Sequence, residues 1–366
     1  MSALDASATP VSSTEATRLA SIEARLLAYH DVRFSVVLNA IAYLRDPGDS
    51  VIAGGSLTVG LGNRLSDLDI VVSGQANAES SRVPFETWLG TLRIDVWKFS
   101  CDAIAELVQR AEGVLAHDAP VDGAFGDNFE EADLKLLHRL AFGVTVDGAP
   151  LQPKASRPYP DIAGDLLARE YAERMRSAAF VTQLALLAGD RFAAAFNARL
   201  AVHSALHATV YTHRLPFTGD KWLRERLTHD ASDLLDIHDA FAVLPEDLTD
   251  AERFARDAVQ ACAQLANQDL SLRTLAPQVG LDAADIALYQ PGNEHFLVLT
   301  KRDCLWDLDD SQAIVWGRIH PDWIFDADDP PALTLAYELY AVGAARLRWQ
   351  RGLPITELAF DQKRIS

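Results

Sequence analysis

Apolar and polar positions follow two different periods along the first 150 residues. Ser50–Ala53 is a short apolar run that ends at two glycines, which predicts a buried strand entering a tight turn. Alternation with period two predicts further strands over 67–72 and 92–99. Leucine, isoleucine and valine recur at helical spacing over these ranges: 14–29, 34–44, 103–111 and 130–141. Helices and strands together predict an α/β domain.

The pattern becomes almost wholly helical from residue 162 to residue 265. Alanine-rich helical segments are predicted at 165–189, 191–213 and 251–265. Three prolines within 153–160 predict a linker ahead of these helical segments.

The last ninety residues predict a small α/β module. Strands at 286–289 and 295–300 flank Pro291-Gly292-Asn293 and predict a hairpin. We expect a further strand over 313–319 and a long helix over 330–349, with Asp329 as its cap. This module would serve as a dimerisation element, a protein-binding module or a lid. Its tryptophans favour a core role: Trp306, Trp316 and Trp323.

A chain of 366 residues suits two or three domains. The expected division is a disordered tail at 1–14, an α/β domain at 15–152, a helical domain at 161–270 and a small C-terminal α/β module at 271–366. The tail has no basic segment followed by an apolar one, and no apolar stretch reaches membrane-spanning length. We therefore expect a cytoplasmic protein without a membrane partner.

Charge and cysteine content narrow the function classes. The 33 basic and 52 acidic residues give a net charge of −19, with no basic run of the kind that neutralises phosphates of a polynucleotide. This makes a nucleic-acid partner unlikely and favours a small-molecule acceptor, for which a cation drawn to an acidic cleft is one option. The three cysteines are widely spaced and predict neither a disulfide framework nor a cysteine-rich metal site.

The candidate chemistry lies between residues 54 and 95. Gly54-Gly55-Ser56 is followed eleven residues later by Asp67-Leu68-Asp69, whose two carboxylates share one face of the predicted strand. Carboxylates this close repel each other unless a cation neutralises them, which suits Mg²⁺ together with substrate phosphates. Ser56 can offer a phosphate its hydroxyl and its backbone N–H.

A third carboxylate, Asp95, projects from the less apolar face of the strand over 92–99. A neighbouring strand would set it beside Asp67 and Asp69. Three convergent carboxylates are what a two-metal phosphoryl-transfer site needs.

With these residues, the chain resembles the DNA polymerase β-like nucleotidyltransferase superfamily. Gly55, Ser56, Asp67, Asp69 and Asp95 fill its signature positions. The string "GGSLTVGLGNRLSDLDIVV" is most similar to the branch that adenylylates small molecules, including the aminoglycoside nucleotidyltransferases. The resemblance covers roughly residues 51–99.

The resemblance implies a mixed-sheet nucleotidyltransferase core and an Mg²⁺-dependent enzyme using two ions. It would move a nucleoside monophosphate, AMP from ATP or the equivalent from another NTP, onto a hydroxyl of a small molecule and release pyrophosphate. Asp67 and Asp69 would hold both metals, and Asp95 would complete the catalytic metal site. Gly55 and Ser56 would hold the β and γ phosphates.

Further candidates lie in the helical domain, which in such enzymes closes over the nucleotide. Lys221 follows a Gly-Asp turn and would reach the triphosphate. Asn197 and Arg199 are weaker cleft candidates, and Glu170 is a weak candidate for an acceptor-side acid. The histidines favour structural roles, although the spacing of two of them can bind Zn²⁺: His138, His203, His207 and His213.

Two alternatives stay open. One is adenylylation of a protein or a tRNA end, which a basic surface beside the cleft would favour. The other is a non-catalytic nucleotide-binding scaffold that recruits a protein partner, or a second copy of the chain, through the C-terminal module.

Overall fold

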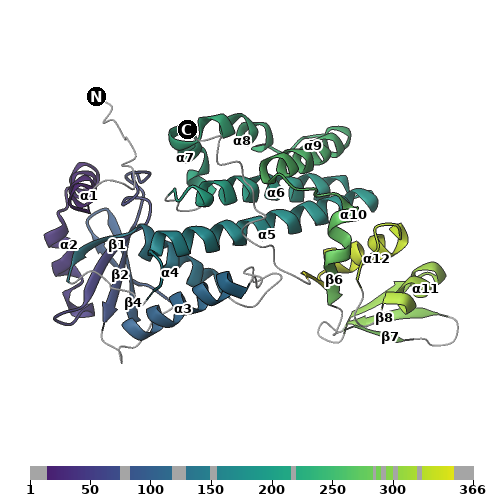
Figure 1. The fold of residues 1–366 in the computed structure, drawn as a ribbon, viewed down its shortest axis with the longest axis horizontal. Coiled ribbons are helices and arrows are strands. Elements are labelled where there is room, and N and C mark those ends of the chain that lie inside the picture. Colours follow the sequence, from purple (N-terminus) through teal and green to yellow (C-terminus); the bar gives the residue numbers. More distant parts are fainter. Residues whose placement is uncertain are drawn as a thin grey trace.

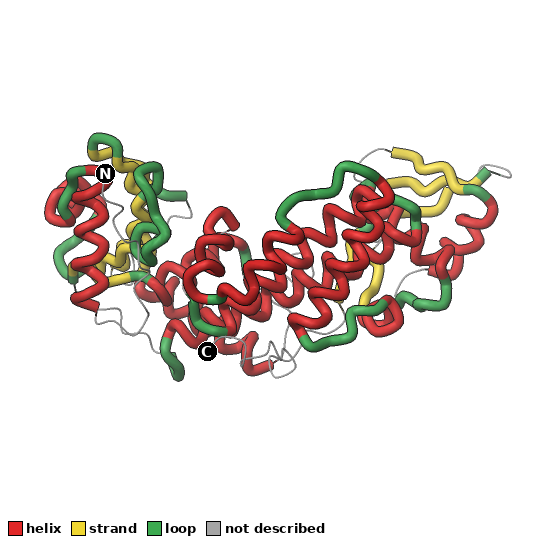
Figure 2. The backbone as a smooth tube through the Cα atoms, turned by 90° about the horizontal axis from the view of Figure 1, so that it is seen from above, coloured by secondary structure: helices red, strands yellow, loops and turns green. Residues whose placement is uncertain are grey.

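The computed structural model describes residues 15–74, 83–117, 129–148, 155–215, 220–282, 286–289, 294–299, 304–319 and 324–349. The predicted tail at 1–14, the turn at 291–293 and Trp323 lie outside these ranges. The large sheet, which has five strands, lies at one end of the molecule, helices fill the middle and two smaller sheets lie at the other end (Figures 1 and 2). The predicted α/β fold with a mixed sheet and a helical region is confirmed.

The sheet has the order β3-β4-β2-β1-β5. Its strands β2 and β4 run parallel, and every other neighbouring pair is antiparallel. The strands are β1 (Ser50–Gly54), β2 (Leu68–Gly74), β3 (Phe85–Leu89), β4 (Leu92–Ser100) and β5 (Val144–Asp147).

Helices cover both faces of this sheet. One core cluster joins it to α1 (Glu15–His30), α2 (Phe34–Ala40) and the 3₁₀ helix η1 (Ala42–Leu44). Another core cluster joins the opposite face to α3 (Cys101–His117) and α4 (Glu131–Phe142).

Period-two geometry decides which side chains meet each layer of helices. Ile70 and Ile94 are fully buried against the α1 side, whereas Val71 packs on the α3 and α4 side. Asp69 and Asp95 share the parity of Val71, so they lie on the α3 and α4 face.

The middle of the molecule is built around α5 (Tyr159–Leu187), which runs from α3 and α4 to the C-terminal module (Figure 1). Pro158 precedes this helix and Pro160 lies in its first turn, so the helix begins within the stretch predicted as a linker. Helices α6 (Arg191–Thr212) and α9 (Leu248–Ala266) pack against α5 and against each other, and α8 (Leu235–Phe241) packs on both α6 and α9. Between α6 and α8 in the chain lie η2 (Asp220–Trp222), α7 (Leu223–Asp230) and η3 (Ser232–Leu234).

The C-terminal module contains a two-stranded and a three-stranded sheet. The predicted hairpin is confirmed, because β7 pairs antiparallel with β8. Strand β9, adjoining β8, is an addition to the prediction. The elements are α10 (Leu272–Leu275), η4 (Ala276–Gln278), β6 (Val279–Asp282), β7 (Ile286–Tyr289), β8 (His295–Leu299), β9 (Cys304–Leu308), α11 (Asp310–Ile319), α12 (Pro330–Ala341) and β10 (Arg346–Trp349).

Two predictions for this module are wrong. The strand predicted over 313–319 is the helix α11, whose start is fixed by Asp309 accepting a 2.7 Å hydrogen bond from the Gln312 backbone. The helix predicted over 330–349 begins as expected, capped by Asp329, but ends at Ala341. Gly343 then turns the chain with a φ of 67°, and β10 pairs with β6.

The division into domains stays a prediction. One core cluster extends from α3 and α4 through the helices to the C-terminal module. Within the described ranges, no helix has the length and apolar character needed to cross a membrane.

Candidate active site

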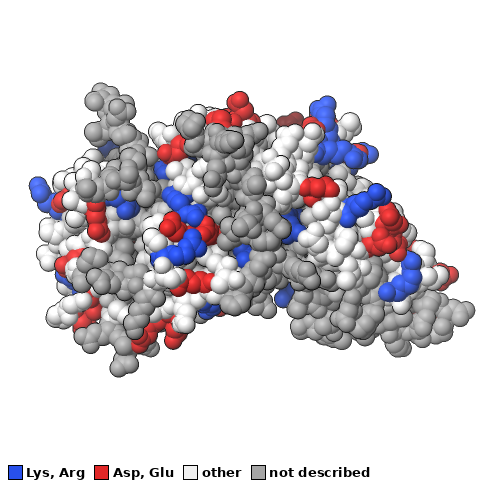
Figure 3. Space-filling model, in the orientation of Figure 1, with Lys and Arg blue, Asp and Glu red and all other residues white. Residues whose placement is uncertain are grey.

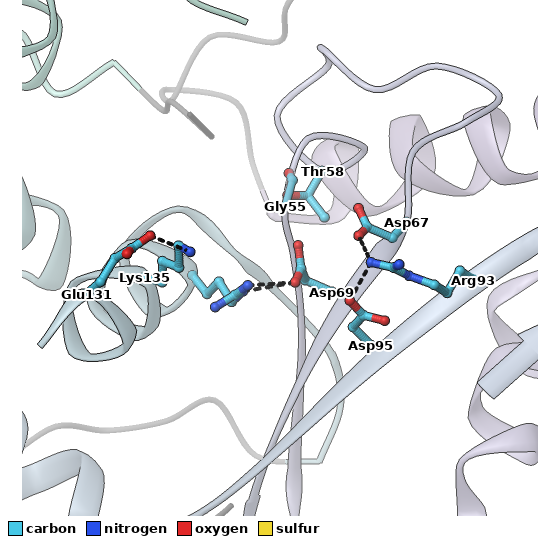
Figure 4. A network of polar contacts seen from close by, with 9 residues as sticks. Gly55, Thr58, Asp67, Asp69, Arg93, Asp95, Glu131 and Lys135 are labelled. Atoms are coloured by element: carbon cyan, nitrogen blue, oxygen red, sulfur yellow. Dashed lines mark hydrogen bonds and ion pairs between the residues drawn. The ribbon is translucent and has the colours of Figure 1, made fainter. Parts of the chain in front are cut away.

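Two adjacent parallel strands present the three predicted carboxylates. Asp69 of β2 and Asp95 of β4 are direct register partners, and Asp67 immediately precedes β2 (Figure 4). Side chains at partnered positions share a face of the sheet, so Asp69 and Asp95 lie side by side. The expectation that a neighbouring strand carries Asp95 to the first pair holds in this geometry.

Two arginines hold these carboxylates, Arg93 (Figure 4) and Arg139. The Arg93 Nη2 donates to Asp67 Oδ2 at 2.6 Å and to Asp95 Oδ2 at 2.9 Å, so one guanidinium bridges two acids. Arg139 of α4 donates from Nε and Nη2 to Asp69 Oδ1, at 3.1 and 2.8 Å. Its guanidinium also lies 4.7 Å from the centre of the Trp97 ring.

Asp95 is the most buried of the three acids, with 7% of its surface exposed. Burial raises the pKa of Asp95, and the neighbouring Asp67 and Asp69 raise it further, while Arg93 opposes the shift. Its Oδ1 is buried and has no hydrogen-bond partner among the described residues. A buried carboxylate oxygen of this kind has unused capacity for a cation or a proton donor.

The glycine turn after β1 lies directly against Asp69. Gly55 has a φ of 81°, and a Cβ at this position would come within 2.3 Å of Asp69 Oδ2. The turn therefore requires glycine both for its conformation and for the close approach. Ser56 is buried, and its carbonyl accepts hydrogen bonds from the Leu61 and Gly62 backbones at 3.1 and 2.9 Å.

A cavity of about 190 Å³ opens beside Gly55 and Asp69, between the five-stranded sheet and the helices α4, α5 and α6. Its lining comes from the turn, β2, α4, α5 and the end of α6: Gly55, Asp69, Glu131, Leu134, Lys135, His138, Arg139, Leu167, Glu170, Tyr171, Arg174 and Tyr211. The cavity thus joins the carboxylates to a mixed apolar and charged wall.

Ion pairs set the electrostatics of this wall. Lys135 pairs with Glu131 at 2.6 Å, and Arg174 pairs with the fully buried Glu170 at 2.7 Å. Together with the pair between Arg139 and Asp69, they place three cationic groups on the lining.

Aromatic rings form the apolar part of the wall. The Tyr171 and Tyr211 rings stack with centroids 5.6 Å apart. Burial lowers the pKa of His138 to about 3, with a smaller contribution from Arg139, so this imidazole is neutral at ordinary pH.

The structure does not bring every candidate to this place. Lys221 lies in η2 with an exposed side chain, its Nζ 5.4 Å from the centre of the Trp222 ring, and it is not among the lining residues. Asn197 donates to the Ala193 carbonyl within α6, and neither it nor Arg199 lines the cavity. Glu170 does line it.

The cations of the site were missed by sequence reasoning. The sequence could have revealed Arg93, because it lies two residues before Asp95 and therefore on the same face of the predicted strand. Arg139 lies on a helix far along the chain from Asp69, and no spacing rule links the two. Arg174 follows Glu170 by four residues, the spacing of a helical ion pair, but that spacing does not reveal that the pair lines the cavity.

The donor chemistry fits Mg²⁺, which prefers carboxylate oxygens. As the side chains lie, no three His, Cys, Asp or Glu side chains within the described ranges are placed to share one metal ion. The Arg93 guanidinium lies between Asp67 and Asp95 instead (Figure 4). Its side chain is 39% exposed and can turn into solvent, which would free both acids.

The histidine pair expected to be structural makes ring contacts, His203 with His238 and His207 with Tyr171.

Comparisons with known proteins add little. No protein-family model matches the chain. No curated protein matches it either. A solved structure of a nucleotidyltransferase-like protein from Exiguobacterium sibiricum 255-15 is similar over 63% of this chain and 73% of that one, with 12% identity and a TM-score of 0.32. A similarity this weak carries no argument about activity.

Proposed function

We propose that this protein is an Mg²⁺-dependent nucleotidyltransferase that transfers a nucleoside monophosphate, AMP in the first instance, from an NTP to a hydroxyl of a small molecule. The observation that carries the proposal is the set of three carboxylates on two parallel strands, directly beside a glycine turn and a cavity. Carboxylates and a close-approach turn are the elements that phosphoryl transfer requires.

The reaction breaks the bond between the α phosphorus and the oxygen that bridges it to the β phosphorus. A bond forms between the α phosphorus and the acceptor oxygen, and pyrophosphate leaves. Asp67, Asp69 and Asp95 would hold Mg²⁺, which supplies charge neutralisation on the triphosphate when bound.

The remaining roles belong to residues of the chain itself. Gly55 lets the backbone approach the β and γ phosphates, with Ser56 beside it. Asp95, the most buried of the three acids, would accept the acceptor proton while it also contacts the metal. Lys135, Arg139 and Arg174 offer positive charge near the leaving pyrophosphate, and Lys221 stays a candidate only if the helical region moves.

Surface charge favours a small acceptor over a polynucleotide. The net charge is −19, and on the face shown in Figure 3 basic and acidic side chains are interspersed. A tRNA end as acceptor would favour a continuous basic surface.

The test is pyrophosphate release from each of the four NTPs with Mg²⁺, against aminoglycosides, lincosamides, nucleosides and bulk tRNA. We expect release that needs one acceptor and disappears in Asp69→Asn. Arg139→Lys is a matched variant that keeps the charge beside Asp69 and should retain part of the activity. Absence of both NTP binding and release would contradict the proposal.

One observation favours a second candidate, a non-catalytic nucleotide-binding protein. The Arg93 guanidinium occupies the space between Asp67 and Asp95, where it neutralises the acids without a metal. That candidate predicts NTP binding that is independent of Mg²⁺, with no pyrophosphate release.

A further inference from the structure

Strand β3 forms one edge of the five-stranded sheet, and among the described strands it pairs with β4 alone. An edge strand carries a row of backbone N–H and C=O groups that can pair with another strand. Natural edges are often blocked by a lysine or by a proline within the strand, and the sequence of β3, Phe85–Leu89, contains neither. This edge is therefore open to a further strand.

The hairpin between β3 and β4 fixes which backbone groups of β3 face outward. Its turn has two residues, so Leu89 and its register partner Leu92 form a hydrogen-bonded pair. Hydrogen-bonded and non-hydrogen-bonded positions alternate along an antiparallel pair of strands. The backbone N–H and C=O groups of Glu86 and Trp88 therefore point away from β4, and they lie symmetrically about Thr87.

The edge also leaves aromatic side chains in solvent. Trp88 is 61% exposed and Phe85 is 44% exposed, and their odd spacing puts them on opposite faces of the sheet. Helix α2 contacts β3 on the Phe85 face and carries the exposed Val36. Aromatic residues are enriched where proteins meet, because they bury a large area there.

A second copy of β3 fits this edge in one antiparallel register. With a two-fold axis through Thr87, the outward groups of Glu86 meet those of Trp88 in the other copy, so all of these groups form hydrogen bonds. Phe85 then lies opposite Leu89 of the other copy. An axis through Glu86 would instead set its two carboxylates opposite each other, and like charges in that position are destabilising.

We propose that two copies of this chain associate through their β3 strands, antiparallel about Thr87, into one continuous sheet. The two-fold axis closes the pairing after one partner, so the product is a dimer and not a fibre. Packing of Phe85 on Leu89 and of the Trp88 ring on the Glu86 side chain adds to the backbone bonds. The inference does not depend on the proposed function, because β3 does not line the cavity and the test measures association.

Cysteine cross-linking tests the register. Opposite residues at a non-hydrogen-bonded position have Cα atoms about 4.5 Å apart, which is within the range of a disulfide. Thr87→Cys should therefore give a covalent dimer under mild oxidation. Glu86→Cys is the matched control, because its two copies would lie diagonally, about 7–8 Å apart, and should cross-link much less. The wild-type chain, with its own three cysteines, gives the baseline.

Analytical ultracentrifugation measures the affinity of the dimer. We expect the wild-type protein to be a dimer at micromolar concentrations. Glu86→Pro removes one outward N–H from each copy and spares the bonds to β4, so it should weaken the dimer by about 5- to 150-fold. Glu86→Ala keeps that N–H and is the matched control, which should dimerise like the wild type.

Three outcomes would overturn the inference. The first is a monomeric wild-type protein. The second is a dimer that a folded Glu86→Pro protein retains at full affinity, because the interface would then lie elsewhere. The third is equal cross-linking by Thr87→Cys and Glu86→Cys, which would contradict the register, and this comparison decides even if Glu86→Pro does not fold.

Discussion

Replacing Arg93 should strengthen divalent-cation binding. The guanidinium donates to Asp67 at 2.6 Å and to Asp95 at 2.9 Å, so a cation that needs these oxygens has to displace it. Arg93→Gln removes this competitor, whereas Arg93→Lys keeps a positive charge without the two-acid bridge.

The magnitude follows from the two contacts. A hydrogen bond between charged groups contributes about 1.5–3 kcal/mol. The Arg93 side chain is 39% exposed, so solvent screening reduces the pair to a combined value of about 1–3 kcal/mol. The cation affinity of Arg93→Gln should therefore rise by about 5- to 150-fold.

The assay is titration of the nucleotide-free protein with Mn²⁺, followed by electron paramagnetic resonance, with Mn²⁺ standing in for Mg²⁺. Arg110→Gln is the matched control, because Arg110 also pairs with a carboxylate, that of Asp133 at 2.6 Å, away from the three acids. It should leave Mn²⁺ affinity unchanged. Equal or weaker Mn²⁺ binding by a folded Arg93→Gln protein would refute the reasoning, since Arg93 would then not compete for the acids.

Three further predictions concern the surroundings of the carboxylates. Gly55→Ala should lower the free energy of unfolding by more than Gly48→Ala does. Both positions have a positive φ, which costs a non-glycine residue about 1–3 kcal/mol, but only at Gly55 does a Cβ also meet the Asp69 carboxylate. Equal denaturation midpoints for the two variants would contradict this. Arg139→Met should cost about 2–4 kcal/mol in urea unfolding, because its pair with Asp69 is only 14% exposed on each side. Lys135 and its partner Glu131 are exposed, so Lys135→Met should lower the free energy of unfolding by less than about 1 kcal/mol. Similar losses of stability in Arg139→Met and Lys135→Met would be evidence that the pair between Arg139 and Asp69 is not buried. The pKa of His138 is lowered to about 3, so its neutral form contributes stability that is present above the ordinary value of 6.5 and is lost as pH falls towards 3. His138→Gln should flatten this dependence in pH-resolved thermal melts, and parallel curves for both proteins would show that the imidazole titrates normally.

Local patterns predicted much of the sheet and of its acids. Period-two alternation in 67–72 and 92–99 was sufficient to place Asp69 and Asp95 on single strand faces. Their pairing depends on β2 and β4 being parallel neighbours, which alternation does not specify. The roles of Asp67, Asp69, Asp95, Gly55, Ser56 and Lys221 stay predictions.

Long-range contacts explain what the sequence did not reveal. Arg139 reaches Asp69 across 70 positions, and only the packing of α4 on the sheet creates that contact. The apolar run in 313–319 fits a strand or a helix equally well over so short a length, and the Asp309 cap decides for the helix. At the C-terminus, the positive φ of Gly343 ends α12 where helical spacing alone would continue it.

The most direct test of the proposed function follows the fate of labelled phosphorus. The protein is incubated with Mg²⁺, an acceptor panel and ATP labelled at either the α or the γ phosphate, and the acceptor and the released anion are separated. A nucleotidyltransferase transfers the α label to the acceptor and releases the γ label as pyrophosphate, and Asp69→Asn should do neither. Transfer of the γ label to the acceptor would contradict the account, because it would show a kinase reaction at this site.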